Sequence, residues 1–295
     1  MTAVGTRSGI LLVDKPTGLT SHDVVSRTRK AAGTRKVGHA GTLDPMATGL
    51  LVLGLNSSTR LLTYLVGLDK EYFATIRLGV STSTDDAEGE VVSTIPAGSI
   101  TDAAIATGIA RLTGPISQVP SSVSAIKVDG KRAYDRVREG ETFELKPRDV
   151  TISTFEVLER RGDELLVRVE CSSGTYVRAL ARDLGADLGV GGHLSALRRT
   201  RIGPFTIDAA SELEGIDVAT RLIEPAAAAS TLFETVTLSE QHTIDLTHGK
   251  RFSVDAPDGS PVAAVTASGR LVGLVTIAEG RVKSLINFPS DEVLA

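Results

Sequence analysis

The chain has 295 residues, of which 41% are hydrophobic and 23% charged, a composition typical of a globular protein and not of a disordered or fibrous one. At roughly 100–200 residues per domain, this length predicts one large and one smaller domain. A single cysteine, Cys171, excludes an intrachain disulfide and a multi-cysteine zinc site. Apolar stretches are far shorter than the roughly 20 residues of a membrane helix. The N-terminus lacks a secretory signal pattern, so we expect a cytoplasmic protein without a membrane segment.

The net charge of −4 is distributed unevenly along the chain. Residues 205–295 contain 6 basic and 13 acidic side chains and carry −7, whereas residues 1–204 contain 26 and 23 and carry +3. Basic residues cluster at 27–36, 127–138 and 198–201. Because salt screens charges beyond about 8 Å, such clusters decide whether phosphates are attracted. The alternative is three solvated surfaces without a nucleic-acid partner.

Hydrophobic patterns predict strands and helices along the first two-thirds of the chain. A buried strand over residues 9–13 is followed by an amphipathic helix that runs to about residue 30, with N-cap candidates in the segment Thr20-Ser21-His22-Asp23. Residues 33–49 contain four glycines and indicate a loop. The periodicity then predicts strands at about 50–55, 70–80 and 150–172 and helices at 101–113 and 177–188. The polar, basic residues 120–150 predict an excursion from the core.

The pattern changes near residue 233. From there, short β-like runs alternate with Asp-Gly, Ser-Gly and Glu-Gly turn signals, which predict a small β-barrel or sandwich-like domain. The alanine-rich residues 225–229 are the expected junction. We therefore expect a mixed α and β chain with a larger domain at 1–232 and a small β domain at 233–295.

One carboxylate, Asp44, lies in the glycine-rich segment GHAGTLDPMATGLL, where glycine lets the backbone approach a ligand closely. Pro45 disfavours the helical conformation at Asp44 and so predicts an extended backbone that holds the side chain at the edge of the loop. Spacing alone also permits a structural role, in which Asp44 and Pro45 begin a helix as N-cap and first-turn residues.

Residues 36–51, KVGHAGTLDPMATGLL, resemble the signature of the bacterial tRNA pseudouridine-55 synthases, the TruB family. Four further segments resemble the same family in the same order: GILLVDKPTGLTSHD at 9–23, KEYFATIRLG at 70–79, SSGTYVRALARDLG at 172–185 and HLSALRRTRIGPF at 193–205. The resemblance implies an α+β fold with a mixed, largely antiparallel sheet flanked by helices and a small C-terminal PUA-like β domain. It also implies an isomerase that converts uridine 55 in the tRNA T-arm to pseudouridine.

The resemblance implies that Asp44 is the nucleophile, which either attacks covalently or abstracts a ribose proton. Its carboxylate must be ionised, and the implied neighbouring cation is Arg178. Tyr72 would stack on the flipped base, and Tyr176 would assist proton removal from C5 of the rotated base. Isomerisation needs no redox change or group donor. The chain shows no dinucleotide pattern, P-loop or metal-ligand spacing, so we expect no cofactor and no metal.

Substrate contacts are also implied. By resemblance, His39 occupies the space of the extruded base and Leu197 contacts the substrate. Lys15 either braces the active-site loop or binds a phosphate. Asp86 either hydrogen-bonds RNA or solvates a turn. The expected partner is the T-arm stem-loop of tRNA, bound by a monomer without an obligatory protein partner.

The basic segment 120–150 resembles the inserted loop that clamps the T-arm in this family. Its cations would contact phosphates, which gives affinity but little sequence information; they are Lys127, Lys131, Arg132 and Arg136. Where similar proteins commonly have Pro-Pro and an aromatic before Ser-Ala, residues 120–125 read PSSVSA. This departure affects the expected packing of the loop and not the active site.

Two other functions are compatible with these residues. An RNA chaperone or binding module would use the same basic surface without turnover, and Asp44→Asn would then change no activity. A hydrolase with paired carboxylates, such as Asp44 and Asp86, would release a free base and leave an abasic site. The mass of the RNA product distinguishes the isomerase from the hydrolase, because pseudouridine has the mass of uridine whereas an abasic site has lost the base.

Overall fold

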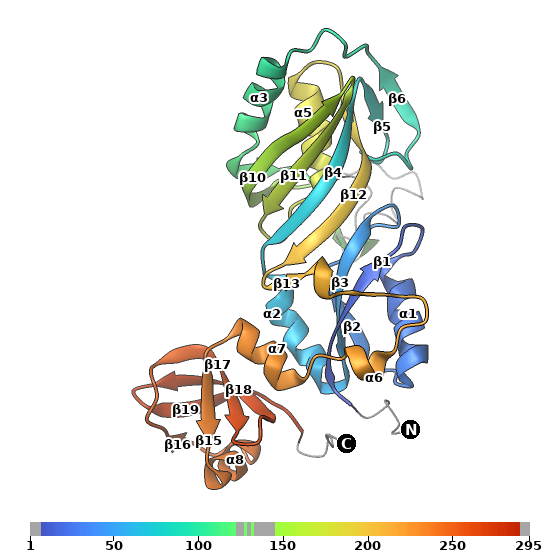
Figure 1. Ribbon diagram of the computed structural model, residues 1–295. Coiled ribbons are helices and arrows are strands. Elements are labelled where there is room, and N and C mark those ends of the chain that lie inside the picture. Colours follow the sequence, from blue (N-terminus) through green and yellow to red (C-terminus); the bar gives the residue numbers. More distant parts are fainter. Residues whose placement is uncertain (1–6, 122–126, 129–130, 133–144, 290–295) are drawn as a thin grey trace. The chain divides into compact units, whose positions relative to one another are not determined.

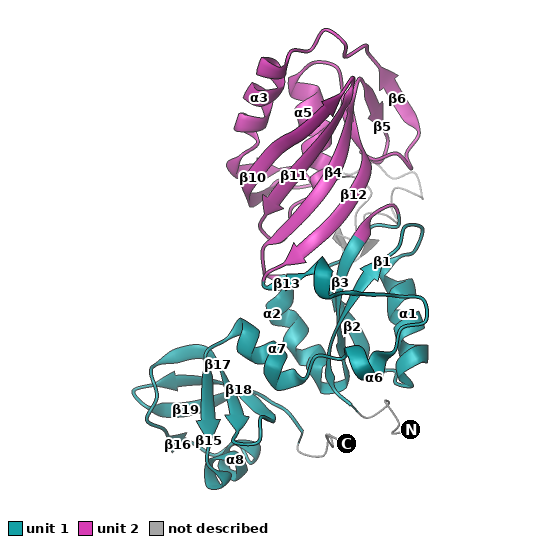
Figure 2. Cartoon of the chain, in the orientation of Figure 1, with its two compact units in different colours: residues 1–45, 49–66, 204–295 teal, residues 46–48, 67–203 magenta. Residues whose placement is uncertain are grey.

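The computed structural model describes residues 7–121, 127–128, 131–132 and 145–289 (Figure 1). The chain forms two compact units (Figure 2). The terminal unit combines residues 1–45, 49–66 and 204–295, and the central unit combines residues 46–48 and 67–203. The mixed α and β fold class, with largely antiparallel strand pairing and a small C-terminal β domain, is confirmed.

The first part of the terminal unit is built on strand β1 (Gly9–Lys15). It pairs antiparallel with β3 (Thr48–Leu55) in the register Gly9 to Leu55 and Lys15 to Gly49. Strand β14 (Ser211–Glu212) pairs with β1 in parallel. The helices and 3-10 turns that accompany these strands are α1 (Ser21–Ala32), η2 (Asn56–Leu61), α2 (Leu62–Val66), η3 (Ile207–Ala209), α6 (Val218–Arg221) and α7 (Pro225–Leu232); a further short strand is β13 (Phe205–Thr206).

Helix α1 shows how local sequence sets its limits. Thr20 caps its N-terminus: the Thr20 Oγ1 accepts from Asp23 N at 3.0 Å while Asp23 Oδ2 accepts from Thr20 N at 2.8 Å, a reciprocal capping box. Gly33 ends the helix with a φ of 65°, which glycine adopts without strain. The buried face includes Val24 and Val25, as the pattern predicts, and packs on the apolar side chains of β1 and β3.

A short strand corrects the loop expected over residues 33–49. Residues Val37–Ala40 form β2, which pairs antiparallel with β3 in the register Val37 to Leu55 and Ala40 to Val52. Val37 and Ala40 are both buried. Glycine weakens a strand, but the pairing with β3 and the burial of two apolar side chains outweigh that local preference.

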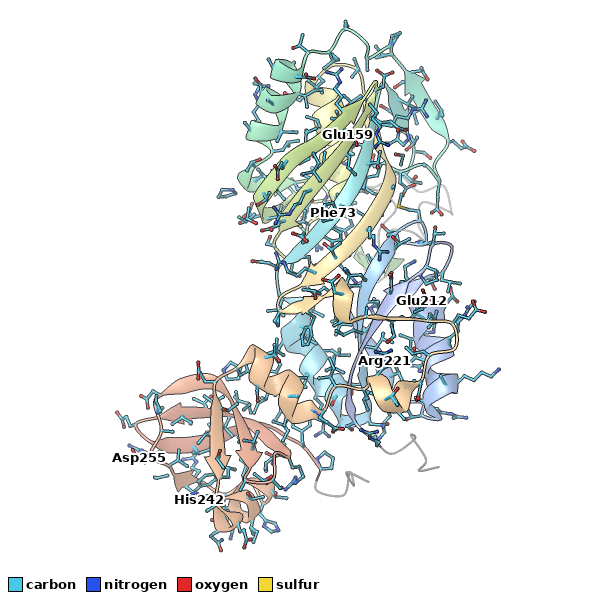
Figure 3. All side chains as sticks on the ribbon, in the orientation of Figure 1. Phe73, Glu159, Glu212, Arg221, His242 and Asp255 are labelled. Atoms are coloured by element: carbon cyan, nitrogen blue, oxygen red, sulfur yellow. The ribbon has the colours of Figure 1, made fainter. Side chains whose placement is uncertain are left out.

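The C-terminal β domain has its own sheet and its own apolar core. The strand order is β15-β17-β18-β19-β16, with only β15 and β17 parallel among the pairs described. The bounds are β15 (Thr235–Leu238), β16 (Phe252–Ser253), β17 (Gly259–Thr266), β18 (Leu271–Ala278) and β19 (Arg281–Asn287). Helix α8 (Glu240–Thr247) carries His242, labelled in Figure 3, whose ring stacks on Phe252 at 4.6 Å.

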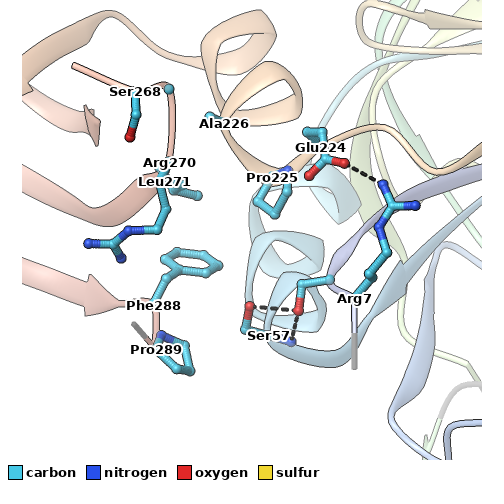
Figure 4. A pocket seen from close by; sticks show the side chains of 12 residues that line it. Arg7, Ser57, Glu224, Pro225, Ala226, Ser268, Arg270, Leu271, Phe288 and Pro289 are labelled. Carbon is cyan, nitrogen blue, oxygen red and sulfur yellow. Dashed lines mark hydrogen bonds and ion pairs between the residues drawn. The ribbon is translucent and has the colours of Figure 1, made fainter. Parts of the chain in front are cut away.

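Two helices were absent from the prediction for this part of the chain. The alanine-rich junction is helix α7, with Pro225 at its start, and α8 interrupts the β-like runs. The N-terminal segment is tied to α7 by an ion pair between Arg7 Nη2 and Glu224 Oε1 at 2.6 Å (Figure 4). Ser57 N and Oγ both approach Ser8 Oγ within 3.0 Å in the same region.

The central unit is an antiparallel sheet in the order β12-β4-β11-β10-β7. Its strands are β4 (Lys70–Leu78), β7 (Gly114–Gln118), β10 (Arg148–Arg161), β11 (Glu164–Cys171) and β12 (Gly192–Ile202), and smaller pairs are β5 (Val80–Thr82) with β6 (Val91–Thr94) and β8 (Lys127–Val128) with β9 (Lys131–Arg132). The helices are α3 (Asp102–Arg111) and α5 (Val177–Asp187).

Helix α5 packs closely on the sheet of the central unit. It contacts β12 and β4, and α3 contacts both α5 and β10, so the two helices cover the same side of the sheet (Figure 1). A Cβ at Gly185 would lie only 2.2 Å from the backbone of Gly191 and Gly192, so glycine is required for this approach. The approach fixes α5, which carries Arg178, against the start of β12.

No helix in the described part of the chain is long and apolar enough to span a bilayer.

Candidate active site

Asp44 lies in the loop between β2 and β3, in the terminal unit, and its side chain is half-buried. It does not begin a helix: residues 41–47 are loop, and β3 follows at Thr48. The structural alternative for the Asp-Pro pair, an N-cap followed by a helical first turn, is therefore wrong.

The backbone on both sides of Asp44 is anchored. Before it, Leu43 N donates to the buried Ser21 Oγ at 2.8 Å, and Ser21 Oγ donates back to Leu43 O at 3.0 Å. After it, Pro45 O accepts from Gly18 N at 2.9 Å and from Lys15 Nζ at 3.4 Å. The carboxylate of Asp44 is thus attached to a backbone that has little freedom to move.

Lys15 is fully buried, and its ammonium group donates hydrogen bonds to backbone carbonyls in and beside this loop. The Nζ also donates to Leu19 O at 2.6 Å and to Pro16 O at 3.0 Å. A buried charge is tolerated where such hydrogen bonds replace water. Of the two roles expected for Lys15, this geometry supports bracing of the loop and not a phosphate contact.

His39 belongs to the same unit as Asp44. It lies on β2, opposite Leu53 of β3, and is partly exposed. The strand therefore holds His39 on a rigid element at the start of the loop that carries Asp44.

The other expected site residues lie in the central unit. Tyr72, on β4, is 7% exposed and faces Val169 of β11 and Arg199 of β12 in the strand register. Phe73, labelled in Figure 3, follows Tyr72 and so points to the opposite face of the sheet. Leu197 is buried and pairs with Ala74, two residues along β4, on the same face as Tyr72.

Arg178, near the start of α5, forms a buried ion pair with Asp86. The distance from Arg178 Nη1 to Asp86 Oδ2 is 3.2 Å, and the two side chains are 4% and 5% exposed. The same Nη1 donates to Thr84 O at 2.7 Å. Asp86 Oδ1 further accepts from Thr84 Oγ1 at 2.5 Å and from Glu88 N at 3.1 Å. Asp86 is therefore engaged inside the protein, where it orders the 83–90 loop and holds a cation.

Two buried ionisable groups lie next to Tyr72 on the same face. Lys70 and Cys171 are partners in the β4–β11 register. Burial, assisted by the charge of the nearby Arg199, lowers the pKa of Lys70 to about 8. Burial raises the pKa of the Cys171 thiol to about 11. Arg199 itself is 1% exposed. The face that carries Tyr72 thus contains two buried cations.

These pKa values predict opposite effects on stability at alkaline pH. Between about pH 8 and 10.5 the unfolded chain holds the Lys70 proton that the folded chain has lost, so the cost of burying the charged ammonium group is removed and stability rises with pH. Between about pH 9 and 11 the folded chain retains the Cys171 proton that the unfolded chain has released, so stability falls. The free energy of unfolding, measured in urea as a function of pH, should no longer contain the Lys70 contribution that rises with pH in Lys70→Met. In Cys171→Ala it should no longer contain the contribution that falls with pH. Profiles parallel to that of the unsubstituted protein would contradict both assignments.

The basic insertion is described only in part. Lys127 and Arg132 are partners in the β8–β9 ribbon, and Lys131 pairs with Val128. Arg136 lies outside the described residues. Within the described ranges, no group of three or more His, Cys, Asp or Glu side chains is arranged to hold a metal ion.

Four polar residues near the expected site residues have a burial or contacts that the sequence pattern did not predict; Arg199, expected in the basic cluster at 198–201, is buried instead. Ser21 and Gln118 are buried polar residues that hydrogen-bond the backbone of site segments, and Lys70 and Arg199 are buried cations beside Tyr72. Arg199 and Lys70 lie within motifs that resemble the TruB family, and this resemblance could have marked them as candidate site residues. No local signal predicts the hydrogen bonds of Ser21 or Gln118, because their partners are distant in the chain.

Comparisons with known proteins agree with this architecture. Three family models together match residues 29–289, the last two with an overlap at 233–240. They are the TruB family pseudouridylate synthase N-terminal domain over residues 29–177, the tRNA pseudouridylate synthase B C-terminal domain over 178–240, and the tRNA pseudouridine synthase II C-terminal domain over 233–289. A tRNA pseudouridine synthase B of Leifsonia xyli is 60% identical, with 97% of this chain and 98% of that protein covered. One of Corynebacterium glutamicum is 52% identical, with 93% and 94% covered.

The fold is also similar to that of solved structures. A chain of an H/ACA ribonucleoprotein bound to a substrate RNA containing 2'-deoxyuridine is 26% identical, with a TM-score of 0.72 and coverage of 96% of this chain and 86% of that chain. A chain of a Cbf5-Nop10-Gar1 complex is 27% identical, with a TM-score of 0.71 and coverage of 98% and 86%. The chain therefore belongs to the TruB family of pseudouridylate synthases, and the resemblance seen in its motifs is confirmed.

Proposed function

We propose that this protein is a tRNA pseudouridine-55 synthase, which binds the T-arm stem-loop of tRNA and isomerises uridine 55. The tRNA substrate is supported by relatives that are 50–60% identical over nearly the whole chain and are named tRNA pseudouridine synthase B. We further propose that it acts as a monomer, with the catalytic domain at 1–232 and the PUA-like β domain at 233–295, and needs no protein partner and no cofactor.

The reaction balances without a second substrate. The N1–C1′ bond of uridine breaks, the base rotates, and a C5–C1′ bond forms. The proton on C5 is released to water and N1 gains a proton, so the product is an isomer of the substrate. The protein therefore has to supply a group that acts on the sugar or base, a surface for the displaced base, and an acceptor for the C5 proton.

Asp44 is the proposed nucleophile. The observation that carries the proposal is the double anchorage of its loop, with Leu43 held by Ser21 and Pro45 held by Gly18 and Lys15. Catalysis depends on holding a reacting group in a fixed geometry, and this anchorage supplies it. Covalent attack and abstraction of a ribose proton both require an ionised carboxylate. We propose that Arg178, oriented by Asp86, provides the compensating positive charge.

Tyr72 and Tyr176 are proposed to act on the base. A flipped base leaves its own stack and needs a flat partner, which Tyr72 offers from a rigid strand. Tyr176 is half-buried at the start of α5 and is proposed to assist removal of the C5 proton. His39 is proposed to fill the space of the extruded base, and Leu197 to contact the substrate. Lys127, Lys131, Arg132 and Arg136 are proposed to hold T-arm phosphates.

The test is release of tritium from a T-arm hairpin whose uridines carry the label at C5. We expect release of one tritium per labelled hairpin, an unchanged product mass for an unlabelled hairpin, and no release from a labelled control hairpin with cytidine in place of uridine 55. An abasic product would establish a hydrolase instead. Tight binding without any release would establish a binding module.

A further inference from the structure

Gln118 is a buried glutamine whose side chain is paired with the backbone of Tyr176. It ends strand β7, is 2% exposed, and lies 58 residues from its partner in the chain. Gln118 Oε1 accepts from Tyr176 N at 2.8 Å, and Gln118 Nε2 donates to Tyr176 O at 3.1 Å. One amide therefore satisfies both backbone groups of one residue. This double pairing also fixes which way the amide points.

Tyr176 depends on this amide because of its place in the helix. It is the N-cap residue of α5, and its own side chain makes no capping hydrogen bond. The first N–H groups of a helix have no partner within the helix and are usually satisfied by a local side chain. Here Gln118, from another strand, supplies the partner for Tyr176 N. It thereby fixes the residue at which α5 begins and the backbone position to which the Tyr176 side chain is attached.

A second contact ties the same strand end to the same helix. Val119, which follows Gln118, accepts at its carbonyl from Arg182 Nη2 at 2.8 Å. Arg182 Nη1 also pairs with Asp85 at 3.1 Å, next to the Asp86 that holds Arg178. The end of β7, the first two turns of α5 and the 83–90 loop therefore form one connected polar network within the central unit.

We propose that Gln118 is a positioning residue for the isomerisation, which acts through the backbone of Tyr176 and makes no contact with the substrate. The inference rests on the proposed function, because it assumes that Tyr176 assists removal of the proton from C5 of the base. A shift of about 1 Å in a catalytic group costs about 100-fold in rate. Without its amide partner, the N-cap residue would lose two hydrogen bonds, and the tyrosine would no longer be held in one place.

The matched pair of variants is Gln118→Met and Gln241→Met. Methionine keeps the length of glutamine without its hydrogen-bonding groups. Gln241 is the exposed counterpart, with one side-chain bond to Asp245 at 3.2 Å. For Gln118→Met we expect the single-turnover rate of tritium release to fall about 10- to 100-fold with hairpin affinity changed less than about threefold, and Gln241→Met to leave both unchanged. Thermal unfolding of the intact chain checks that each variant is folded at the assay temperature.

A mutant cycle with Tyr176→Phe separates positioning from a purely structural role. If Gln118 acts through the phenol, Gln118→Met should slow a Tyr176→Phe enzyme far less than it slows the unsubstituted one. Equal fold-changes in both backgrounds would overturn the proposal, as would an unchanged rate. Gln118→Glu keeps the acceptor for Tyr176 N, and as an ionised carboxylate it cannot donate to Tyr176 O; it replaces Gln118→Met if that variant does not fold. An unsubstituted protein without tritium release would refute the proposed function itself, whereas an active protein with equally active Gln118 variants would refute only this inference.

Discussion

Asp44→Asn is expected to abolish isomerisation while the T-arm hairpin still binds. Asparagine has nearly the same size and leaves the anchored loop intact, but its amide is a poor nucleophile and a poor base. We expect the rate of tritium release to fall about 10⁴-fold or more. The dissociation constant for the hairpin should change little, because affinity for RNA comes mostly from cations that contact phosphates.

The control for this experiment is Asp163→Asn, an exposed aspartate in the turn between β10 and β11. It makes the same change of charge in the other unit, the central one, and both rate and affinity should stay at the level of the unsubstituted protein. Undiminished release by Asp44→Asn would remove the basis of the proposed mechanism. Loss of binding and rate together would indicate instead that the substitution disrupts the loop.

Asp86→Asn is expected to lower the free energy of unfolding by about 3 kcal/mol or more, because it leaves the buried Arg178 guanidinium without that negative charge. The matched control is Asp85→Asn. Asp85 pairs with Arg182, and the two side chains are 13% and 30% exposed, so that pair lies closer to water than the pair of Asp86 and should contribute about 1 kcal/mol. Asparagine also tolerates the φ of 62° at position 85. Urea unfolding of the two variants measures the difference.

The activity of Asp86→Asn should fall as well, since Arg178 would lose the partner that orients it. A double-mutant cycle with Arg178→Met tests the cause: the cost of Asp86→Asn should shrink when the guanidinium is already absent. An equal cost in both backgrounds, or equal costs for Asp85→Asn and Asp86→Asn, would show that the ion pair does not determine stability here.

Features with a local cause were predictable from the amino-acid sequence alone. The N-cap candidates at 20–23 and the apolar face with Val24 and Val25 predict α1. The uninterrupted apolar run at 9–13 predicts β1, and alternation of apolar residues predicts β4. Such elements form because residues within one turn or one strand carry the signal. The placement of Asp44 in a glycine-rich loop also followed from its neighbours, and the family followed from several motifs in register.

Features that depend on residues far apart in the chain became visible only in the folded structure. Strand β2 exists because β3 pairs with a glycine-containing segment. Arg178 meets Thr84 across 94 positions, and Gln118 meets Tyr176 across 58. Lys15 is inside because the loop offers its ammonium group three carbonyls. A polar side chain in the sequence looks the same whether water or a distant backbone group will satisfy it, and only folding, which removes the water, makes that choice.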